Sequence, residues 1–399
     1  MTSEAEILIV GGGIAGASAA YHLAAHGRRV TLLERGEIAS GASGVNGGLI
    51  DCVGWGDHPD LQAHLTAGSV ELFEEAQLEL GEDMEFRRSG SLHAIHTPEQ
   101  HEFTAARVAD MCARGQRVEL ITTREARALE PAFSADLLGA MYSPLRAQAD
   151  PVKATRAFAT LAARRGARIL TRCDVTALAP RPAGGWVARA GEADIVAGVL
   201  VLAAGAWCGA LGARLDLDVP IVAVRGQMWA TAALGPRVFH TISSAESALA
   251  WHRDPGVAPS SLTIRDGRRL TRHLYGRQRR DGEIVFGGDR ELVGEDTTPD
   301  PAGITVNREH AADVLPFLRD LPAARTWAGL MPFPLDGRPL IGRIPGREHL
   351  WIVSGLASSG FGRGPMAGKL LADSVHGGQP LPILADADPA GRVRELSSR

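Results

Sequence analysis

Residues 6–34 read EILIVGGGIAGASAAYHLAAHGRRVTLLE in this 399-residue chain. Residues 6–10 and 28–33 are predicted to form two short strands, and residues 17–26 between them have the composition and period of a helix. A G-x-G-x-x-G segment fills the turn between the first strand and the helix. A glycine-rich turn alone is common, but in this order of strand, turn, helix and strand it predicts a bound dinucleotide.

The three glycines of this fingerprint have different roles. Gly11 permits the tight turn, Gly13 lets a diphosphate approach the backbone, and Gly16 lets the helix pack closely on the sheet. The free N–H groups at the start of the helix favour phosphate. Glu34 ends the second strand, where it can accept hydrogen bonds from an adenosine ribose, so we expect a ribose without a 2′-phosphate.

A run of small residues at 40–50, SGASGVNGGLI, follows the second strand. Small side chains suit a loop whose backbone lies against a flavin and its diphosphate, because bulky ones would block that approach. On composition alone the run also fits a flexible surface linker. We interpret it as part of the cofactor site.

The chain resembles the D-amino-acid oxidase family, which includes glycine oxidase, sarcosine oxidase and D-amino-acid dehydrogenases. The resemblance starts with the fingerprint and the Ser-Gly-Ala-Ser-Gly-x-Asn-Gly-Gly run, and it continues in family order along nearly the whole chain. The further matching segments are Leu129–Pro131, Asp150-Pro151, Gly166-Ala167, Val175-Thr176, 199–207, Arg225–Gln227, 327–330 and 336–342. A second dinucleotide fingerprint, usual in flavoenzymes reduced by a nicotinamide cofactor, is not found, so the resemblance implies a flavin reduced by the substrate.

The resemblance implies FAD as the cofactor and assigns residues to it. Some sarcosine-oxidase-like members attach the flavin through a cysteine in the C-terminal region, but no cysteine lies beyond Cys208, so we expect non-covalent FAD. No metal is expected. The residues expected to bind the cofactor are Gly11, Gly13, Ile14, Ala15, Gly16, Glu34, Arg35, Ser43, Gly44, Asn46, Gly47, Gly48, Leu49, Val175, Ala204, Gly205, Trp207, Gly329, Gly355, Ser358, Ser359, Gly360 and Phe361.

The resemblance also implies an α/β fold, in which a Rossmann-like FAD-binding domain is interleaved with a substrate domain built on an antiparallel β-sheet. The expected FAD-binding domain is discontinuous and comprises residues 1–80, 145–220 and 325–399. The expected substrate domain comprises residues 81–144 and 221–324.

Local patterns add detail to the substrate domain. Strand patterns occur at 226–231, 272–275 and 283–288, and the pair Asp281-Gly282 is a hairpin turn signal before the last of them. Helical patterns occur at 60–80, 99–114 and 306–319. The tail after about residue 382 is expected to be poorly ordered.

The implied reaction is oxidation of the C–N bond of a small amine or amino-acid-like substrate. The substrate would lose its ammonium proton, a hydride would pass from the adjacent carbon to flavin N5, and the imine would hydrolyse in water. Such a site needs no obligatory protein base. Sarcosine-oxidase-like members use a lysine of the substrate domain to assist the reaction of the flavin with oxygen. Lys153 and Lys369 both lie outside the expected substrate domain, which favours an electron acceptor other than oxygen.

The substrate site departs from the family pattern at two positions. Glycine oxidase and its relatives clamp the substrate carboxylate with an arginine where this chain has Met331, and Ser358 takes the place of a second arginine. Arg272 and His273 are the first candidates to replace the clamp, and Tyr275 could hydrogen-bond a substrate that is anionic.

Other interpretations of these residues are open. The seven arginines between 265 and 280 fit the solvated face and turn of a hairpin, which charge patterning favours. Arg363 is a further candidate for anion binding. His240 and His252 could contact a substrate, although a lone histidine is more often structural.

Two other functions are also open. One is a 2-hydroxy-acid dehydrogenase, because related flavoproteins oxidise C–O bonds and usually offer a histidine base. The other is the flavin subunit of a hetero-oligomeric amine or opine dehydrogenase, which would bind FAD but turn over poorly alone. A non-catalytic flavin-binding scaffold is disfavoured by the intact fingerprint.

Composition and charge fit an ordinary globular protein, with 45% hydrophobic and 22% charged residues. A net charge of −4 disfavours nucleic acid or a membrane surface as partner. Four scattered cysteines fit reduced thiols, the acidic N-terminus is unlike a secretory signal, and no apolar run approaches the roughly 20 residues of a membrane span. We therefore expect a cytoplasmic protein with a small-molecule substrate. Whether it forms a homo- or hetero-oligomer stays open.

Overall fold

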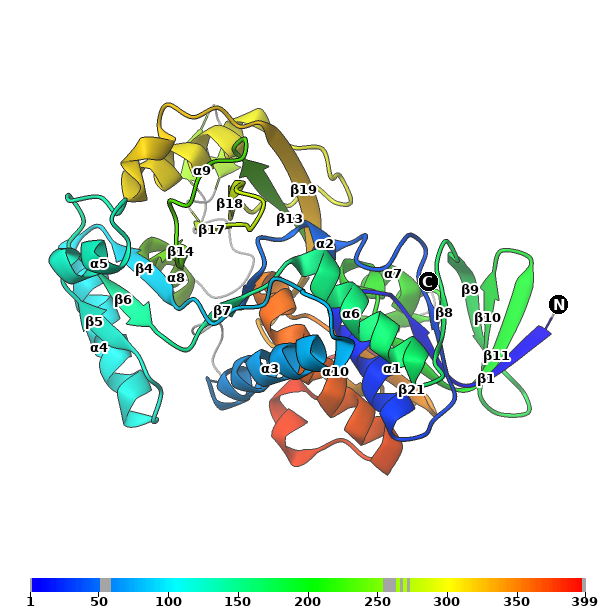
Figure 1. Cartoon of the computed structure of the whole chain (residues 1–399). Helices are drawn as coiled ribbons and strands as arrows, with labels where there is room; N and C mark the ends of the chain where they lie inside the picture. Colours follow the sequence, from blue (N-terminus) through cyan, green and yellow to red (C-terminus); the bar gives the residue numbers. More distant parts are fainter. Residues whose placement is uncertain (1, 51–58, 254–262, 266–267, 271–272, 397–399) are drawn as a thin grey trace.

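The computed structural model describes residues 2–50, 59–253, 263–265, 268–270 and 273–396. Two eight-stranded sheets organise these residues (Figure 1). The first sheet has the order β20-β21-β11-β1-β2-β8, and β10 and β9 continue from β11 as a side branch. Its strands are β1 (Thr2–Val10), β2 (Val30–Leu33), β8 (Arg168–Leu170), β9 (Val175–Pro180), β10 (Trp186–Ala190), β11 (Ala193–Leu202), β20 (Leu340–Arg343) and β21 (Leu350–Ser354).

The central strands of the first sheet are buried on both faces, as parallel strands usually are. Ile7 and Ile9 belong to the core on one face, and Leu8 and Val10 belong to the core on the other. The first face is covered by the helices α1 (Ile14–Ala25), α3 (Pro59–Leu80), α6 (Pro151–Arg164) and α10 (Gly360–Gly377). Strands β9 and β10 and the short helix α7 (Cys208–Ala213) contribute to the second core.

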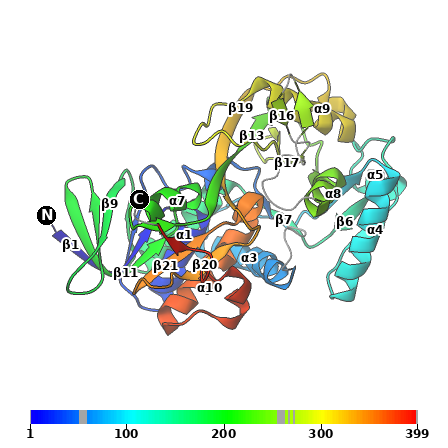
Figure 2. The same ribbon diagram turned by 180° about the vertical axis from the view of Figure 1, so that it is seen from behind.

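The second sheet has the order β19-β13-β18-β17-β14-β4-β6-β5. Figure 2 shows its strands β19, β13, β17 and β6 from behind. Its pairs are antiparallel except β14 with β4. Its strands are β4 (Ser91–Ile95), β5 (Glu119–Ile121), β6 (Gly139–Ser143), β13 (Ile221–Ala230), β14 (Thr241–Ser244), β17 (Tyr275–Gln278), β18 (Ile284–Gly287) and β19 (Arg325–Pro334). The helices that accompany it are α4 (Pro98–Ala113), α5 (Thr123–Leu129), α8 (Ala245–Arg253) and α9 (Pro301–Val314). The predicted α/β fold with a Rossmann-like sheet and a mainly antiparallel second sheet is confirmed.

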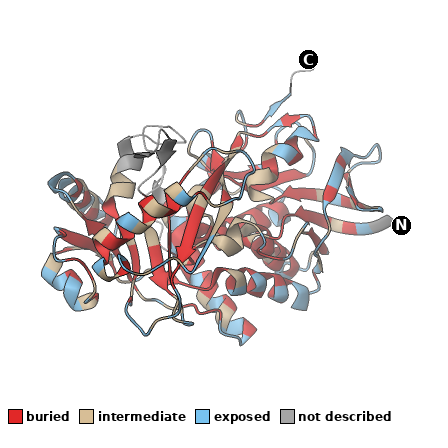
Figure 3. Cartoon of the chain, turned by 90° about the horizontal axis from the view of Figure 1, so that it is seen from above, coloured by how far each residue is buried: buried red, intermediate tan, exposed pale blue. Residues whose placement is uncertain are grey.

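Several local predictions are also confirmed. β17 and β18 form an antiparallel hairpin around Asp281-Gly282, and Gly282 has a φ of +92°. The helical patterns at 60–80 and 99–114 match α3 and α4 to within one residue at each end. Figure 3 shows buried residues concentrated in the sheets and exposed residues on the outer faces of the helices.

Two predictions are wrong in detail. The helix expected at 306–319 is α9, which begins earlier because the Asp300 side chain accepts a hydrogen bond from the Gly303 amide at its start. The described part of the tail after 382, residues 383–396, is ordered. It forms a 3₁₀-helix at Pro382–Ala387 and the strand β22 (Arg394–Glu395), which pairs with β12 (Leu217–Asp218).

The strand β19 bears on the expected domain limits. It pairs with β13 along its full length, from Arg325 opposite Ala230 to Pro334 opposite Ile221. Its residues fall in the segment 325–399 that we expected in the FAD-binding domain, whereas its pairing places it in the second sheet. The division of the chain into two domains stays a prediction.

None of the described helices is long and apolar enough to cross a membrane.

Candidate active site

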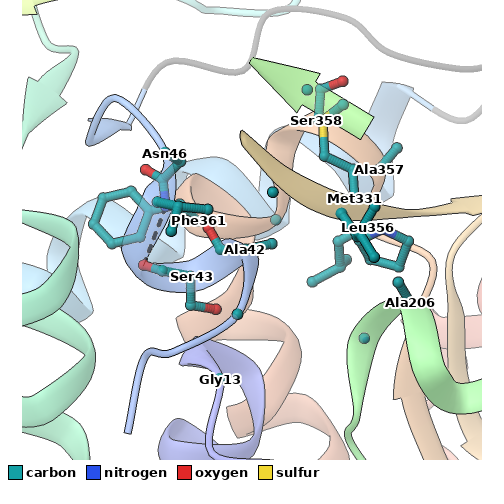
Figure 4. A pocket seen from close by; sticks show the side chains of 18 of the residues that line it. Gly13, Ala42, Ser43, Asn46, Ala206, Met331, Leu356, Ala357, Ser358 and Phe361 are labelled. Carbon is teal, nitrogen blue, oxygen red and sulfur yellow. Dashed lines mark hydrogen bonds between the residues drawn. The ribbon is translucent and has the colours of Figure 1, made fainter. Parts of the chain in front are cut away.

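A cavity of about 570 Å³ lies between the loops of the first sheet and one face of the second. Loops after β1, β2 and β11 and the start of α10 form one wall, and residues of β13, β14, β17 and β19 form the other. Figure 4 shows Gly13, Ser43 and Phe361 on one side of the cavity and Met331 and Ser358 on the other.

The turn after β1 is built from close backbone contacts. Gly11 has a φ of +121°, and a Cβ atom there would lie 2.4 Å from the Ala203 carbonyl oxygen. A Cβ atom at Gly16 would lie 2.1 Å from the Gly11 carbonyl oxygen, so α1 can approach the sheet only with glycine at this position. The Ser43 hydroxyl accepts a hydrogen bond of 2.9 Å from the Ile14 amide, which holds the 40–50 loop at the start of α1.

Glu34, directly after β2, lines the cavity. Its carboxylate accepts hydrogen bonds from the Gly12 amide (2.7 Å), the Gly36 amide (2.8 Å) and the Ser40 hydroxyl (3.2 Å). A carboxylate offers about four acceptor positions, so Glu34 can also accept from a ribose hydroxyl. The guanidinium of Arg35 lies 3.8 Å from the ring centre of the neighbouring Trp207.

Asn46 shapes the small-residue loop instead of pointing a free amide into the cavity. Its Nδ2 donates to the carbonyl oxygens of Ala42 (3.0 Å) and Ser43 (3.1 Å), and its Oδ1 accepts from the Gly48 amide (2.8 Å) (Figure 4). These bonds close the helical turn α2 (Ala42–Val45). The loop is therefore ordered, and the surface-linker interpretation is wrong.

Most of the residues expected at the cofactor line the cavity. They are Gly11, Gly13, Ile14, Ala15, Glu34, Arg35, Ser43, Asn46, Leu49, Val175, Ala204, Gly205, Trp207, Gly329, Ser358, Ser359, Gly360 and Phe361. Five glycines of the expected set do not line it, because they serve close packing of the chain instead: Gly16, Gly44, Gly47, Gly48 and Gly355.

The wall formed by the first sheet fits FAD. The helices α1 and α10 both begin at the cavity, so the partial positive charge of each N-terminus faces the space where an anionic, electron-rich cofactor would lie. Gly13 borders this space and has no side chain to fill it. Glu34 lines the cavity at the end of β2, the strand next to β1, where an acidic residue can bind the ribose of a dinucleotide.

The opposite wall is a row of residues paired across the second sheet. In sheet order these are His93, Ser243, Tyr275, Gly287, Met228 and Trp327. Directly paired residues point to the same face, and His93, Ser243, Tyr275 and Met228 all line the cavity. The Trp327 indole donates a hydrogen bond of 2.7 Å to the Val45 carbonyl, so this face lies against the 40–50 loop.

A β-bulge after β18 brings Arg290 to the cavity. From the Met228–Gly287 pair to the Arg225–Glu291 bridge, one strand advances by three residues and the other by four, which leaves one extra residue. The Nη2 atom of Arg290 donates a hydrogen bond of 2.8 Å to the Ser358 hydroxyl. Sequence reasoning missed Arg290, and the Gly287-Gly288 pair before it is the signal that could have indicated a bulge.

The charge of this site follows from its burial. Arg290 is 6% exposed, and its guanidinium lies 5.2 Å from the ring centre of Phe333. Burial lowers the pKa of Arg290, but a guanidinium keeps its charge in proteins. Burial and the nearby Arg290 hold the pKa of His273 well below its usual value, so His273 is neutral at neutral pH. Burial raises the pKa of Tyr275 to about 12, and its hydroxyl donates to the Met228 sulfur at 3.1 Å.

The structure brings four of the five candidate catalytic residues to the cavity: His273, Tyr275, Met331 and Ser358. The fifth, Arg272, lies outside the described residues, as does the side chain of His252. His240 is not at the cavity but beside Glu130, with its Nδ1 atom 3.2 Å from the carboxylate.

Two expectations about arginines are wrong. Arg363 does not line the cavity, because its buried guanidinium donates to the Gln62 side chain at 3.0 Å between α10 and α3. The arginines at 265–280 do not all form a solvated face. Arg277 is 1% exposed, and its Nε atom donates a hydrogen bond of 2.6 Å to the Gly47 carbonyl of the 40–50 loop.

Comparisons with known proteins bear on this arrangement. A family model described as FAD dependent oxidoreductase (DAO) matches residues 6–374. The glycine oxidase of Pseudomonas aeruginosa is 30% identical over 97% of this chain and 99% of its own. Mitochondrial dimethylglycine dehydrogenase of Rattus norvegicus is 27% identical over 97% of this chain, which spans 44% of that longer protein.

A solved structure agrees with the fold. The crystal structure of glycine oxidase from Geobacillus kaustophilus matches with a TM-score of 0.83 and 24% identity, covering 97% of this chain and 98% of that one. The match of the family model confirms FAD as the cofactor that the sequence motifs predicted. The chain belongs to the DAO family of FAD-dependent oxidoreductases.

Proposed function

We propose that this enzyme oxidises the C–N bond of a small amino-acid-like amine, and that Arg290 holds an anionic group of that substrate. The position of Arg290 supports the proposal that it binds an anionic group of the substrate. Its guanidinium lines the cavity, is oriented by Ser358, and lies on the same wall as Tyr275. A carboxylate in reach would gain charge-assisted hydrogen bonds of about 1.5–3 kcal/mol each. Glycine and dimethylglycine, after which two relatives are named, both combine an amine with a carboxylate.

The chain's own residues would bind, orient and exclude water. We propose that the cofactor-binding residues lining the cavity hold FAD non-covalently, with the diphosphate at the start of α1 and the ribose at Glu34. When bound, FAD would supply the two-electron acceptor for oxidation of the C–N bond. Met331, Met228 and Tyr275 give the site an apolar wall that favours the uncharged amine over the ammonium form. The product imine then hydrolyses in water.

A 2-hydroxy-acid dehydrogenase is the competing function, and one observation favours it. Neutral His273 lines the cavity near Arg290, where a base for a hydroxyl group and an anion-binding group would both be needed. The names of the relatives favour the amine, so the hydroxy acid ranks second. A role within a hetero-oligomer also stays a proposal.

Anaerobic reduction of the bound flavin tests the function. The purified holoenzyme is mixed with glycine, N-methyl amino acids, D-amino acids and 2-hydroxy acids, and loss of the oxidised flavin band at about 450 nm is recorded. We expect bleaching by a carboxylate-bearing amine. Bleaching by hydroxy acids alone would overturn the C–N assignment. Readmission of air then distinguishes an oxidase from a dehydrogenase.

A further inference from the structure

The cavity continues beyond Tyr275 along the row of the second sheet. Its wall there comprises His93 of β4, Ser243 and Ser244 of β14, and Ser247 and Ala248 of α8. These side chains are small or polar, unlike Met228 and Met331 nearer the other end. The cavity therefore has a hydroxyl-rich end with a histidine, separate from the guanidinium of Arg290.

The strand order gives the distance over which the cavity extends beyond Tyr275. Ser243 is one strand from Tyr275, and His93 is two strands from it. Neighbouring strands lie about 4.8 Å apart, so the Cα atoms of Tyr275 and His93 are separated by roughly 10 Å. A glycine molecule spans only about 3.6 Å from its amine nitrogen to a carboxylate oxygen. A glycine-sized substrate beside Tyr275 would leave this end of the cavity unused.

The polar groups at this end are held in place by the fold. The Nδ1 atom of His93 and the hydroxyl oxygen of Ser243 are 2.8 Å apart, which fixes the imidazole ring on the cavity face of the sheet. The Ser247 hydroxyl accepts a hydrogen bond of 3.2 Å from the Leu274 amide, which ties α8 to the residue preceding β17. An oriented imidazole with an adjacent hydroxyl is suited to donate hydrogen bonds to an acceptor group.

We infer that His93, Ser243 and Ser247 form a second polar subsite, which binds a hydrogen-bond-accepting group, with a carboxylate as the best fit, at the far end of the substrate. The inference rests on the proposed function and narrows it. The preferred substrate is then an amino-acid-like amine with two polar ends, one at Arg290 and one at His93. Glycine and simple N-methylglycines become poor substrates, because they cannot occupy both ends.

Ligands that cannot be oxidised test the subsite without turnover. Malonate, glutarate and pimelate are titrated into the holoenzyme, each compared with the monocarboxylate of equal chain length, namely propanoate, pentanoate and heptanoate. Dissociation constants come from the change in the visible flavin spectrum. We expect at least one dicarboxylate to bind about tenfold more tightly than its partner, the gain of one charge-assisted hydrogen bond.

Three variants connect this preference to the proposed residues. Ser243→Ala removes only a hydroxyl group, and His93→Ala removes the ring. Each is expected to reduce the tenfold preference to less than about threefold, a loss of about 0.7 kcal/mol or more. His101→Ala, at an exposed position of α4, is the matched control and should keep the preference.

The proposal is overturned if no dicarboxylate is preferred, or if the preference survives in both His93→Ala and Ser243→Ala. Because these ligands carry no amine, the binding ratio is measurable whether or not an amine reduces the flavin. Failure of the C–N assignment and failure of the second subsite therefore give different results.

Discussion

Arg290 and Ser358 connect the second sheet to the turn before α10 through a hydrogen bond of 2.8 Å from Nη2 to Oγ. Arg290 lies in the bulge after β18, and Ser358 lies in the 3₁₀ turn Ala357–Ser359 before α10. From the family resemblance, we expect Ser358 at a position where glycine oxidase and its relatives carry an arginine. In this structure the Ser358 hydroxyl accepts the hydrogen bond from Arg290 and orients its guanidinium.

Arg290→Met should weaken the use of an anionic substrate. Loss of one or two charge-assisted hydrogen bonds predicts a 10- to 100-fold lower kcat/KM, as an order-of-magnitude estimate, with most of the change in KM. Steady-state kinetics with the best amine from the reduction panel would measure this. Ser358→Ala keeps the charge and should cost less than about tenfold.

Arg319→Met is the control for Arg290→Met, since the side chain of Arg319 is 61% exposed in a surface ion pair with Asp313. It should leave kcat/KM unchanged. An Arg290→Met enzyme with an unchanged KM for carboxylate substrates would contradict the assigned role of Arg290. The flavin content of each variant shows whether FAD is still bound.

Gly16→Ala should prevent stable FAD binding. The new methyl group would lie 2.1 Å from the Gly11 carbonyl oxygen, so either α1 or the turn after β1 must shift. Overpacking of this kind typically costs about 1–3 kcal/mol. We expect a lower melting temperature and a reduced ratio of flavin to protein absorbance after purification.

Gly235→Ala is the matched control for this methyl group. Gly235 has no atom within 4 Å of the added Cβ position and no positive φ. Its melting temperature and flavin content should equal those of the parent protein. If Gly16→Ala behaves like Gly235→Ala, the close contact does not limit FAD binding.

The sequence was sufficient for the parts of the site that depend on local backbone geometry. The fingerprint at Gly11–Gly16, Glu34 and the 40–50 loop each follow from a turn, a strand end or a close approach, and such features are encoded within a few residues. Eighteen of the residues that the family resemblance assigned to the cofactor, including those of these local segments, line the cavity. The family resemblance supplied the order of the more distant segments.

The substrate wall could not be predicted in the same way, because it depends on which strands become neighbours. His93 and Ser243 are 150 residues apart in sequence but share a row through the β4–β14 pair. Arg290 reaches the cavity through one inserted residue in a strand pair, whereas Arg363 on α10 is turned towards Gln62. No periodic pattern distinguishes these two arginines.

Arg277→Met should loosen the 40–50 loop. Arg277 donates hydrogen bonds to the Gly47 carbonyl (2.6 Å) and to the Gln148 side chain (3.2 Å), and Nη1 lies 4.0 Å from the Glu85 carboxylate. Removal of a buried cation from such a cluster costs about 3–5 kcal/mol in typical cases. We expect at least tenfold weaker FAD binding in equilibrium titrations of the deflavinated protein.

Arg280→Met is the control for Arg277→Met, because it tests whether removal of another arginine from the same hairpin also weakens FAD binding. Arg280 pairs with Asp83 at the surface, where an ion pair contributes about 0–1 kcal/mol. Its FAD affinity should be close to that of the parent protein. Equal affinities for Arg277→Met and Arg280→Met would show that the bond to Gly47 does not position the loop.

His22 should make the protein less stable in mild acid. Burial on α1 lowers the pKa of His22 from 6.5 to about 4. Between these values the unfolded chain binds a proton that the folded protein does not, so the stabilisation is complete above pH 6.5 and is lost as the pH falls towards 4. The shift corresponds to at most about 3 kcal/mol.

His22→Asn cannot gain this charge, so its unfolding free energy in urea should fall less than that of the parent protein over the same pH range. Parallel curves for the two proteins would mean that other groups cause the acid sensitivity.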